Sequence, residues 1–364
     1  MDMTTDSRME KLLKAAKRRR LDMVLVCSQA NVMALSGVNC DSAVLVLSPA
    51  TGRVALYTDF RYASMVRRVA PSLPCRDIKR LRLSGRRIGY ESSIPHLKYL
   101  AFEKKAPKAK FVDVTADIAP LRAVKTPDEI AKIRAAEKLA CDIWNDATAK
   151  FKAGMTELEM ARIIRRMAAE RSEGESFSTI VCVGKNAAEC HHEPDDTVWN
   201  GREPVLVDMG VRLDGVCSDL TRNYLPGTIP PNPAKPSKPS KLSKPPKPSK
   251  LYLRVYSLVL EANEAAIAAA RPGMSVKALD NVARSIIRKG GFGKCFGHSL
   301  GHGVGYEVHE APTVSRKGKM VLEPGMVLTI EPGIYLEGNL GVRIEDLVLI
   351  TENGCEVLSS SAAK

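Results

Sequence analysis

The chain has 364 residues, more than a typical single domain, and its composition of 45% hydrophobic and 26% charged residues is that of a globular protein. No stretch approaches the roughly 20 consecutive apolar residues of a membrane span, and residues 1–20 lack the apolar core of a signal peptide. The nine cysteines are odd in number and form no CxxC pair, which favours reduced thiols over a disulfide framework. We therefore expect a two-domain protein of the cytoplasm without a membrane partner.

The charge balance is strongly basic, with a formal net charge of +14. Six lysines lie between Lys235 and Lys250 in a stretch without acidic residues, and further basic clusters lie at 17–20 and 79–82. Such a balance is compatible with a nucleic-acid partner. The sequence lacks the interleaved aromatic and basic residues of a recognised nucleic-acid-binding module. Solvated surfaces explain the clusters more simply, and we do not expect a nucleic-acid partner.

Residues 1–120 predict a small α/β domain. Apolar runs bounded by turn residues indicate strands, and helical periodicity indicates helices. In chain order these are a basic helix at 8–20, a buried strand at 22–27, a hairpin formed by 43–47 and 53–58, a helix from Asp59 to Val69, and strands at 88–90 and 111–114. Because strands alternate with helices, these elements favour one compact α/β unit.

The second domain is expected at 121–364, and its start is marked by two helix-capping signals. Thr126-Pro127-Asp128-Glu129 combines an N-cap threonine, a proline at the first helical position and a glutamate three residues after the cap. This helix is expected to end near Lys150. Thr156-Glu157-Leu158-Glu159 repeats the capping pattern and predicts a second helix to about Arg171.

An internal repeat follows in the same domain. Residues 152–156 are echoed by 271–275, and His191 is answered by His309 at a similar offset. Two further correspondences keep the same order, namely Glu203-Pro204 with Glu323-Pro324 and the strand ending at Asp208 with the strand ending at Glu331. The sequence thus predicts two similar helix–helix–strand halves that bring both sets of acidic residues to one crevice.

A hairpin in the first half is expected to bring two aspartates together. Asp214-Gly215 between alternating strands is a strong two-residue turn signal. With that turn, Asp208 lies opposite Thr221, and Asp208 and Asp219 emerge on one face as diagonal neighbours. Two carboxylates this close repel each other unless they are protonated or bridged by cations.

Residues 298–310 form the candidate active site. His298, His302 and His309 fall within thirteen residues that also contain three glycines. A single histidine is most simply explained as a half-buried, hydrogen-bonded side chain, but this clustering and the downstream carboxylates Glu331 and Glu345 favour a site.

Asp208, Asp219, His302, Glu331 and Glu345 together offer four carboxylates and one imidazole. That set is too rich in oxygen for a structural zinc site, which favours Cys and His. It suits a pair of harder divalent ions, most simply Mn²⁺, with Co²⁺, Fe²⁺ or Zn²⁺ as alternatives. Two ions in such a site can activate water and polarise a carbonyl group.

The segment 298–310 and the ordered set of five ligands resemble the metallopeptidase family of Xaa-Pro aminopeptidases and Xaa-Pro dipeptidases (prolidases). The resemblance covers most of the chain, because 58–62 is similar to a segment of the creatinase-like N-terminal domain and 125–357 is similar to the catalytic domain. It implies an α+β fold in which a smaller α/β domain precedes a pita-bread catalytic domain, two pseudo-symmetric halves around a curved antiparallel sheet. Tyr306, where a smaller aliphatic residue is usual, is one departure from the family pattern.

The resemblance also implies roles for individual residues. A metal-bridging hydroxide would attack the carbonyl before proline, Glu331 would move the proton, His309 would stabilise the oxyanion and His191 would orient the substrate. His298, Tyr335 and Arg343 would contact the substrate, with His298 in the proline pocket. The family further implies a homodimer and a proline-containing peptide as substrate.

Three alternatives remain beside an Xaa-Pro aminopeptidase. A dipeptidase differs only in how it accommodates the C-terminal side of the substrate. A binding protein that has reused the fold would usually have lost ligands, and all five are present. A creatinase-like hydrolase would need no metal.

The Lys/Pro/Ser-rich stretch 226–250 is not a family feature. Its near-perfect three-residue period suits polyproline II. We expect a solvated insertion, or alternatively a tether for an acidic partner.

Overall fold

The computed structural model describes residues 3–225 and 248–364. The chain divides into two compact units, Met1–Arg122 and Ala123–Lys364. The expectations for the Lys/Pro/Ser-rich stretch fall mostly on residues 226–247, which lie outside the described residues. Within the described part of the chain, no helix is long and apolar enough to cross a membrane.

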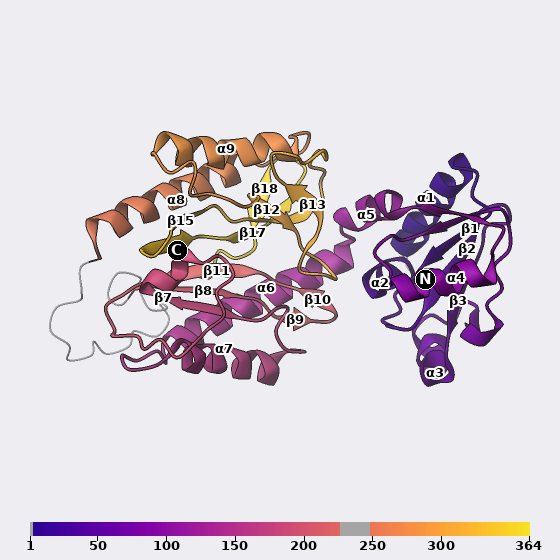
Figure 1. The fold of residues 1–364 in the computed structure, drawn as a ribbon, viewed down its shortest axis with the longest axis horizontal. Helices are drawn as coiled ribbons and strands as arrows, with labels where there is room; N and C mark the ends of the chain where they lie inside the picture. The colour runs from indigo at the N-terminus through magenta and orange to yellow at the C-terminus, as the bar shows by residue number, and fades with distance from the viewer. Residues whose placement is uncertain (1–2, 226–247) are drawn as a thin grey trace. The chain divides into compact units, whose positions relative to one another are not determined.

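The first unit is built on a six-stranded mixed sheet of order β4-β3-β2-β1-β5-β6 (Figure 1). Strand β1 (Met23–Val26) is buried at every residue, pairs antiparallel with β2 (Val44–Ser48) and pairs parallel with β5 (Arg87–Tyr90). The remaining strands are β3 (Arg53–Thr58), β4 (Cys75–Asp77) and β6 (Lys110–Asp113). The helices are α1 (Met3–Arg18), α2 (Gln29–Ser36), α3 (Phe60–Val69), α4 (His96–Lys105) and α5 (Thr115–Ala123), with a short 3-10 helix at Ile78–Arg80.

The expected elements of this unit are present, and besides the short 3-10 helix four others were not predicted. Helix α3 begins after Asp59, whose side chain accepts a hydrogen bond from the Arg61 amide. The elements missed from the sequence are α2, β4, α4 and α5. Neither α2 nor α4 has a side-chain cap, and α5 contains Pro120, so the local signals that announce a helix are weak there.

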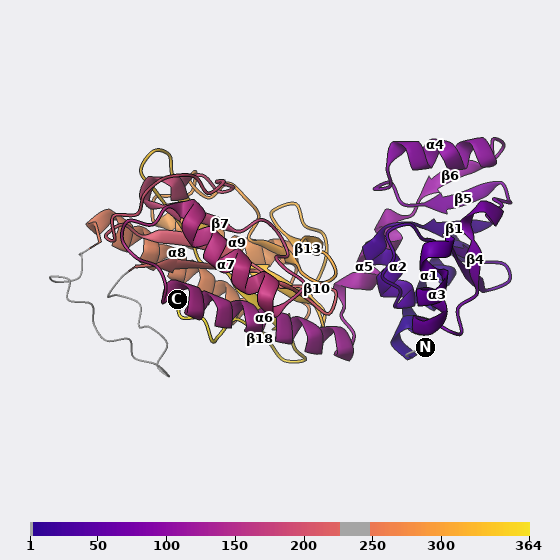
Figure 2. The same cartoon turned by 90° about the horizontal axis from the view of Figure 1, so that it is seen from below.

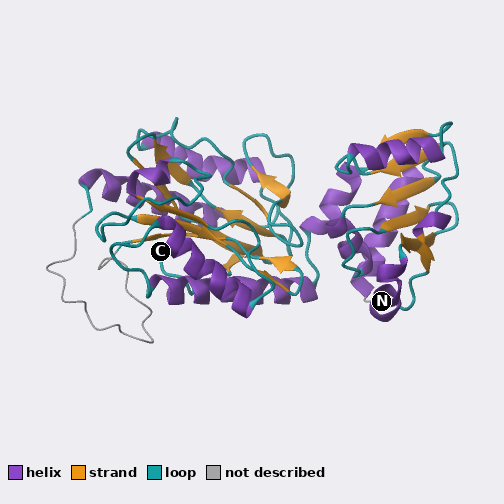
Figure 3. Ribbon diagram, turned by 60° about the horizontal axis from the view of Figure 1, so that its bottom comes forward, coloured by secondary structure: helices purple, strands orange, loops and turns teal. Residues whose placement is uncertain are grey.

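The second unit places antiparallel strands between two pairs of helices (Figures 1 and 3). Helices α6 (Pro127–Thr148) and α7 (Glu157–Arg171) cover one side, seen in front in Figure 2, and α8 (Lys250–Ala269) and α9 (Val276–Lys289) cover the other. One sheet has the order β11-β8-β7 and another β13-β12-β14-β17-β18. The strands are β7 (Ile180–Val183), β8 (Val205–Met209), β9 (Arg212–Leu213), β10 (Val216–Cys217), β11 (Leu220–Tyr224), β12 (Gly301–Gly303), β13 (Glu310–Val314), β14 (Val327–Ile330), β15 (Gly333–Leu336), β16 (Leu340–Arg343), β17 (Asp346–Ile350) and β18 (Cys355–Val357), with a 3-10 helix η2 (Gly184–Ala188).

The internal repeat has a structural counterpart. Both predicted capping boxes are formed, at Thr126 and at Thr156. Thr156 caps α7 and bridges to Val198, and Ser275 caps α9 and bridges to Val321 in the same way. In each half, the residue that caps the second helix therefore also pairs with a later loop, the one before β8 in the first half and the one before β14 in the second.

The Asp-Gly turn is formed as expected. Asp214 and Gly215 both have positive φ, 50° and 77°, and Leu213 pairs with Val216 across the turn. The register continues into β8 and β11, where Asp208 lies opposite Thr221. The alternation of these strands thus fixes which face Asp208 occupies.

Candidate metal centre

The two aspartates of the first half are held in different ways. Asp208 lies within β8, and its carboxylate forms an ion pair with Arg343 at 2.6 Å. Asp219 lies just before β11, is buried, and its backbone amide donates to the carboxylate of Glu137 on α6 at 3.2 Å. Helix α6 therefore fixes the backbone from which the Asp219 side chain projects.

The second half brings three further groups to the same place. His302 on β12 lies with Nε2 3.3 Å from Glu331 Oε1, just after β14, and 3.6 Å from Asp219 Oδ2. Glu345 lies between β16 and β17, and its carboxylate accepts a hydrogen bond from Thr221 Oγ1 at 2.7 Å. Ligand atoms of Asp219, His302 and Glu345 all lie within 4.8 Å of one another. Residues separated by more than a hundred positions thus converge on one point.

The carboxylates of this cluster repel one another, which favours the binding of cations. Burial, and then the charges of Glu345, Asp208 and Glu331, raise the pKa of Asp219 well above its usual value. The pKa of Glu345 is raised for the same reasons, burial first and then Glu331 and Asp208. Burial also acts to raise the pKa of Glu331, but the hydrogen bond and charge of His302 outweigh it, so the pKa of Glu331 is lowered.

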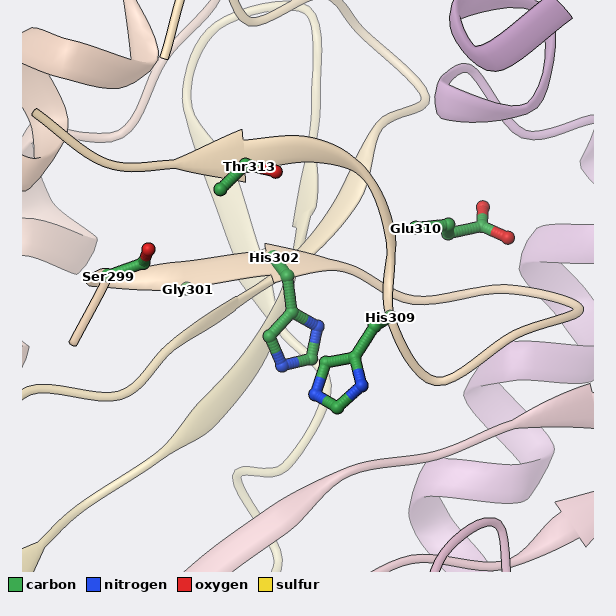
Figure 4. Close-up of a pocket in the computed structure, with 6 residues that line it drawn as sticks. All are labelled: Ser299, Gly301, His302, His309, Glu310 and Thr313. Atoms are coloured by element: carbon green, nitrogen blue, oxygen red, sulfur yellow. The ribbon is translucent and has the colours of Figure 1, made fainter. Parts of the chain in front are cut away.

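The donor set fits divalent metal ions. Asp208 Oδ1 is buried without a hydrogen-bond partner among the described residues, although its other oxygen is paired. An orphaned carboxylate oxygen beside further carboxylates and one imidazole offers the ligands that harder divalent ions prefer. The adjoining pocket has a volume of about 420 Å³ and is lined by Ser299, Gly301, His302, His309, Glu310 and Thr313 (Figure 4).

His309 lies beside the cluster on the rim of this pocket. Its ring centroid is 4.3 Å from that of His302, and Figure 4 shows the two imidazoles next to each other. Burial and then the neighbouring His302 lower the pKa of His309, so its ring is neutral near pH 7. His191 is exposed in the loop after η2, near enough for its charge to act on His309.

His298, Tyr335 and Arg343 form one hydrogen-bonded chain. His298 Nδ1 donates to the Ser299 carbonyl at 2.8 Å, which leaves Nε2 to accept from the Tyr335 hydroxyl at 2.9 Å. Arg343 Nη1 donates to the same hydroxyl at 2.9 Å, and its Nη2 reaches Asp208. The chain thus links the predicted proline-pocket residue to a predicted metal ligand.

Tyr306 does not line the pocket; it packs against the hydrophobic core that includes α6 and α7.

A second histidine–carboxylate group was not predicted from the sequence. Glu157, His192 and Asp195 also have ligand atoms within 4.8 Å of one another. The Glu157 carboxylate, however, already accepts four hydrogen bonds: from the Val183 amide at 2.6 Å, Asn186 Nδ2 at 3.0 Å, His192 Nε2 at 2.7 Å and the Asp195 amide at 3.1 Å. Because its lone pairs face donors, this group is suited to holding a loop rather than an ion.

Residues 131–352 match the metallopeptidase family M24, and residues 8–124 match the creatinase/prolidase N-terminal domain. The chain belongs to metallopeptidase family M24. This M24 metallopeptidase is 31% identical to the uncharacterised peptidase YqhT of Bacillus subtilis, over 97% of the chain and 98% of that relative. It is 41% identical to an uncharacterised peptidase of Staphylococcus aureus over 68% of the chain, a match that spans 66% of that relative, slightly under two thirds of its length.

Solved structures agree with this assignment. A prolidase from Pyrococcus horikoshii superposes with a TM-score of 0.87 at 31% identity, covering 97% of this chain and 98% of that one. An X-Pro aminopeptidase from Thermotoga maritima gives a TM-score of 0.78 at 30% identity, covering 95% and 97%. The expected family and the pita-bread fold with its creatinase-like N-terminal domain are confirmed. Members of the family depend on a dinuclear metal centre.

Proposed function

We propose that this M24 metallopeptidase is an Xaa-Pro aminopeptidase that holds two divalent ions, most simply Mn²⁺. Asp208, Asp219, His302, Glu331 and Glu345 would hold the ions. Two observations carry this proposal: the buried Asp208 oxygen has no hydrogen-bond partner among the described residues, and ligand atoms of Asp219, His302 and Glu345 lie within 4.8 Å of one another. When bound, the ions supply Lewis-acid polarisation of the scissile carbonyl and activation of water.

The chain's own residues supply the remaining chemistry. Glu331 takes the proton of the attacking water and passes it to the proline nitrogen as the peptide bond breaks. His309 is neutral at pH 7 and donates an N–H to the carbonyl oxygen as negative charge develops there. His191 orients the peptide from the facing loop, and His298 borders the proline ring while Tyr335 and Arg343 fix its orientation.

The basic side chains near the site are already paired with carboxylates, which supports the aminopeptidase over the dipeptidase. A dipeptidase must meet the free carboxylate that follows proline, and an arginine or lysine is the usual partner. Among the described residues that line the pocket there is no lysine or arginine. Lys125 is already paired with Glu310 at 2.5 Å, and Arg343 with Asp208.

The dipeptidase remains the second candidate, because solved prolidases superpose on the chain as well as aminopeptidases do. All five ligand types are retained, which weighs against the more distant alternative of a binding protein that has lost catalysis.

The family resemblance supports a proposal for the oligomeric state, and the cysteines support one for the cellular compartment. We propose a homodimer, because the resemblance implies one. All nine cysteines lie in the described part of the chain and none forms a disulfide, which supports a reducing compartment such as the cytoplasm.

The decisive assay compares Ala-Pro with Ala-Pro-Ala after reconstitution with Mn²⁺, with Ala-Ala-Ala as the control peptide. We expect cleavage of both proline peptides, a higher kcat/KM for the tripeptide, and little turnover of the control. Turnover restricted to Ala-Pro would establish the dipeptidase, and absence of turnover with every divalent ion tested would refute the peptidase proposal.

A further inference from the structure

The loop 189–196, which carries His191, is fastened at two points. On one side of His191, the Cys190 carbonyl accepts a hydrogen bond from Arg343 at 3.5 Å. On the other side, the ring of His192 points inward and donates Nε2–H to Glu157 at 2.7 Å. His191 itself is exposed. The predicted substrate-orienting residue thus lies between two backbone neighbours that are each tied to the folded domain.

Glu157 is the anchor for this loop. It is fully buried at the start of α7 and accepts from the backbone amides of Val183 and Asp195 as well as from His192. The Asp195 carbonyl in turn accepts from the Leu158 amide at 3.1 Å. A buried carboxylate that accepts several N–H groups is held rigidly.

His192 also connects this anchor to the surface. Since Nε2 donates to Glu157, Nδ1 faces Glu189 Oε2 at 3.3 Å, and that contact is favourable only when Nδ1 carries a proton. The Glu189 side chain is 76% exposed, while that of His192 is 9% exposed. Only the outer contact can therefore be lost to solvent.

Three acidic groups face the His192 ring: Glu157 on α7, Glu189 after η2 and Asp195 in the loop itself. Burial, the largest single influence, opposes protonation, but Glu157 and then Glu189 and Asp195 outweigh it and raise the pKa of His192 above 6.5. The doubly bonded imidazolium therefore persists to higher pH than an ordinary histidine would allow.

We propose that His192 is a positioning residue, which bridges the buried Glu157 and the exposed Glu189 and so holds His191 in place against the bound peptide. This inference rests on the proposed function, because His191 acts on a peptide there. The hydrogen-bond partners of His192, Glu157 and Glu189, are neither proposed metal ligands nor residues that line the pocket. Its loss should therefore weaken substrate placement more than the chemical step, so KM should rise while kcat changes little.

The first arm of the test compares His192→Ala with His192→Gln, whose amide nitrogen can replace Nε2 as the donor to Glu157. His96→Ala, an exposed histidine of the first unit, is the matched control. We expect His192→Ala to raise KM for Ala-Pro-Ala about tenfold with kcat within about twofold, and His192→Gln, which keeps only the bond to Glu157, to restore part of that loss. An unchanged KM in His192→Ala, or a loss that His192→Gln does not rescue, would overturn the proposal.

The second arm is the pH profile of KM. Because the folded pKa of His192 is raised, the outer link is present below it and is lost as pH rises through it. We expect KM of the wild type to rise in that window. The corresponding step should be absent in His192→Gln and should move to lower pH in Glu189→Gln, which removes one stabilising anion. Identical profiles for all three proteins would contradict the proposal.

A third arm does not depend on activity and separates the two proposals. Amide hydrogen exchange of peptides covering 184–197 should be faster in His192→Ala and close to wild type in His192→Gln. If the wild type cleaves no Xaa-Pro peptide, the proposed function fails while this arm still tests the loop. Unchanged exchange in His192→Ala, or a loss of bound Mn²⁺ per chain in that variant, would overturn the positioning role.

Discussion

The catalytic unit contains two groups of histidine and carboxylate side chains that look alike in composition but differ in what surrounds them. In the anchor group, which consists of Glu157, His192 and Asp195, every hydrogen-bond partner of the Glu157 carboxylate is an N–H donor, and two of these donors are backbone amides. In the metal-ligand group of Asp208, Asp219, His302, Glu331 and Glu345, Asp219 is surrounded by His302 and by other carboxylates, and one oxygen of Asp208 has no partner among the described residues. Residue types alone therefore do not identify a metal site, whereas unmet hydrogen-bonding capacity does.

The two groups also differ in how burial is compensated. A buried carboxylate is stable when donors replace water, as they do around Glu157. Asp219 has one counter-charge near it in His302, yet its pKa and that of Glu345 are raised by burial and by other acids. The metal-ligand group is thus incomplete without added cations, and the anchor group is complete as it is.

The largest effect is expected from Asp219→Ala. This substitution removes a predicted ligand and relieves repulsion among buried acids, so bound metal should fall and turnover should drop at least about a thousandfold. The metal-free variant should melt no lower than the metal-free wild type. Elemental analysis, turnover of Ala-Pro-Ala and thermal melting measure these three quantities, and full metal content with normal turnover would show that Asp219 is no ligand.

The opposite pattern is expected from Glu157→Ala. Removing this carboxylate leaves two backbone amides and two side-chain donors without their acceptor, which should cost about 3 kcal/mol of unfolding free energy. Metal bound per folded chain should stay at the wild-type value, because Glu157 is no ligand. Urea unfolding and metal analysis of the folded fraction provide the measurements. A variant that folds with normal stability but loses an ion would reverse the distinction between the two groups.

Metal removal should have an effect that depends on pH. The folded pKa values of Asp219 and Glu345 are raised, so without metal these acids destabilise the fold increasingly as pH rises from their unfolded pKa values near 4 towards the folded ones. Bound cations remove that penalty. The difference in Tm between Mn²⁺-loaded and chelated protein should therefore grow from about pH 5 to pH 8. A difference that shrinks with rising pH would contradict this electrostatic account.

Features of the site that depend on residues close together in the sequence could be predicted, whereas those that depend on contacts between distant residues were missed. The Asp214-Gly215 turn and strand alternation predicted that Asp208 lies opposite Thr221, because both signals are local. Histidine clustering and the family resemblance named the remaining ligand candidates. The support of Asp219 by Glu137 was missed, because it joins residues 82 positions apart and Glu137 fits an ordinary helix position.

The anchor group illustrates the same limit. Glu157 was read from the sequence only as part of a capping box, a role for which Thr156 and Glu159 suffice. Of the two adjacent histidines, only His191 was assigned a role from the sequence. Nothing in the local pattern shows that one of two adjacent histidines turns inward, because the burial that decides it comes from α7 and β7.

The smallest effect is expected from the Lys/Pro/Ser-rich stretch, and the structure sharpens where a deletion should end. Because loop-length costs grow slowly and the stretch holds no ligand residue, the sequence alone predicts that removing 233–249 is nearly neutral. Ser249, however, is the N-cap of α8 and accepts a hydrogen bond from the Tyr252 amide at 3.0 Å.

A deletion of 233–247 should therefore leave Tm and turnover nearly unchanged, whereas a deletion of 233–249 should cost about 1 kcal/mol through the lost cap. Ser249→Ala in the full-length chain is the matched control and should reproduce that cost without any change in length. Paired unfolding curves of the three variants separate the two contributions. If the shorter deletion lost metal or turnover, the stretch would belong with the metal-ligand group and would no longer be a solvated insertion.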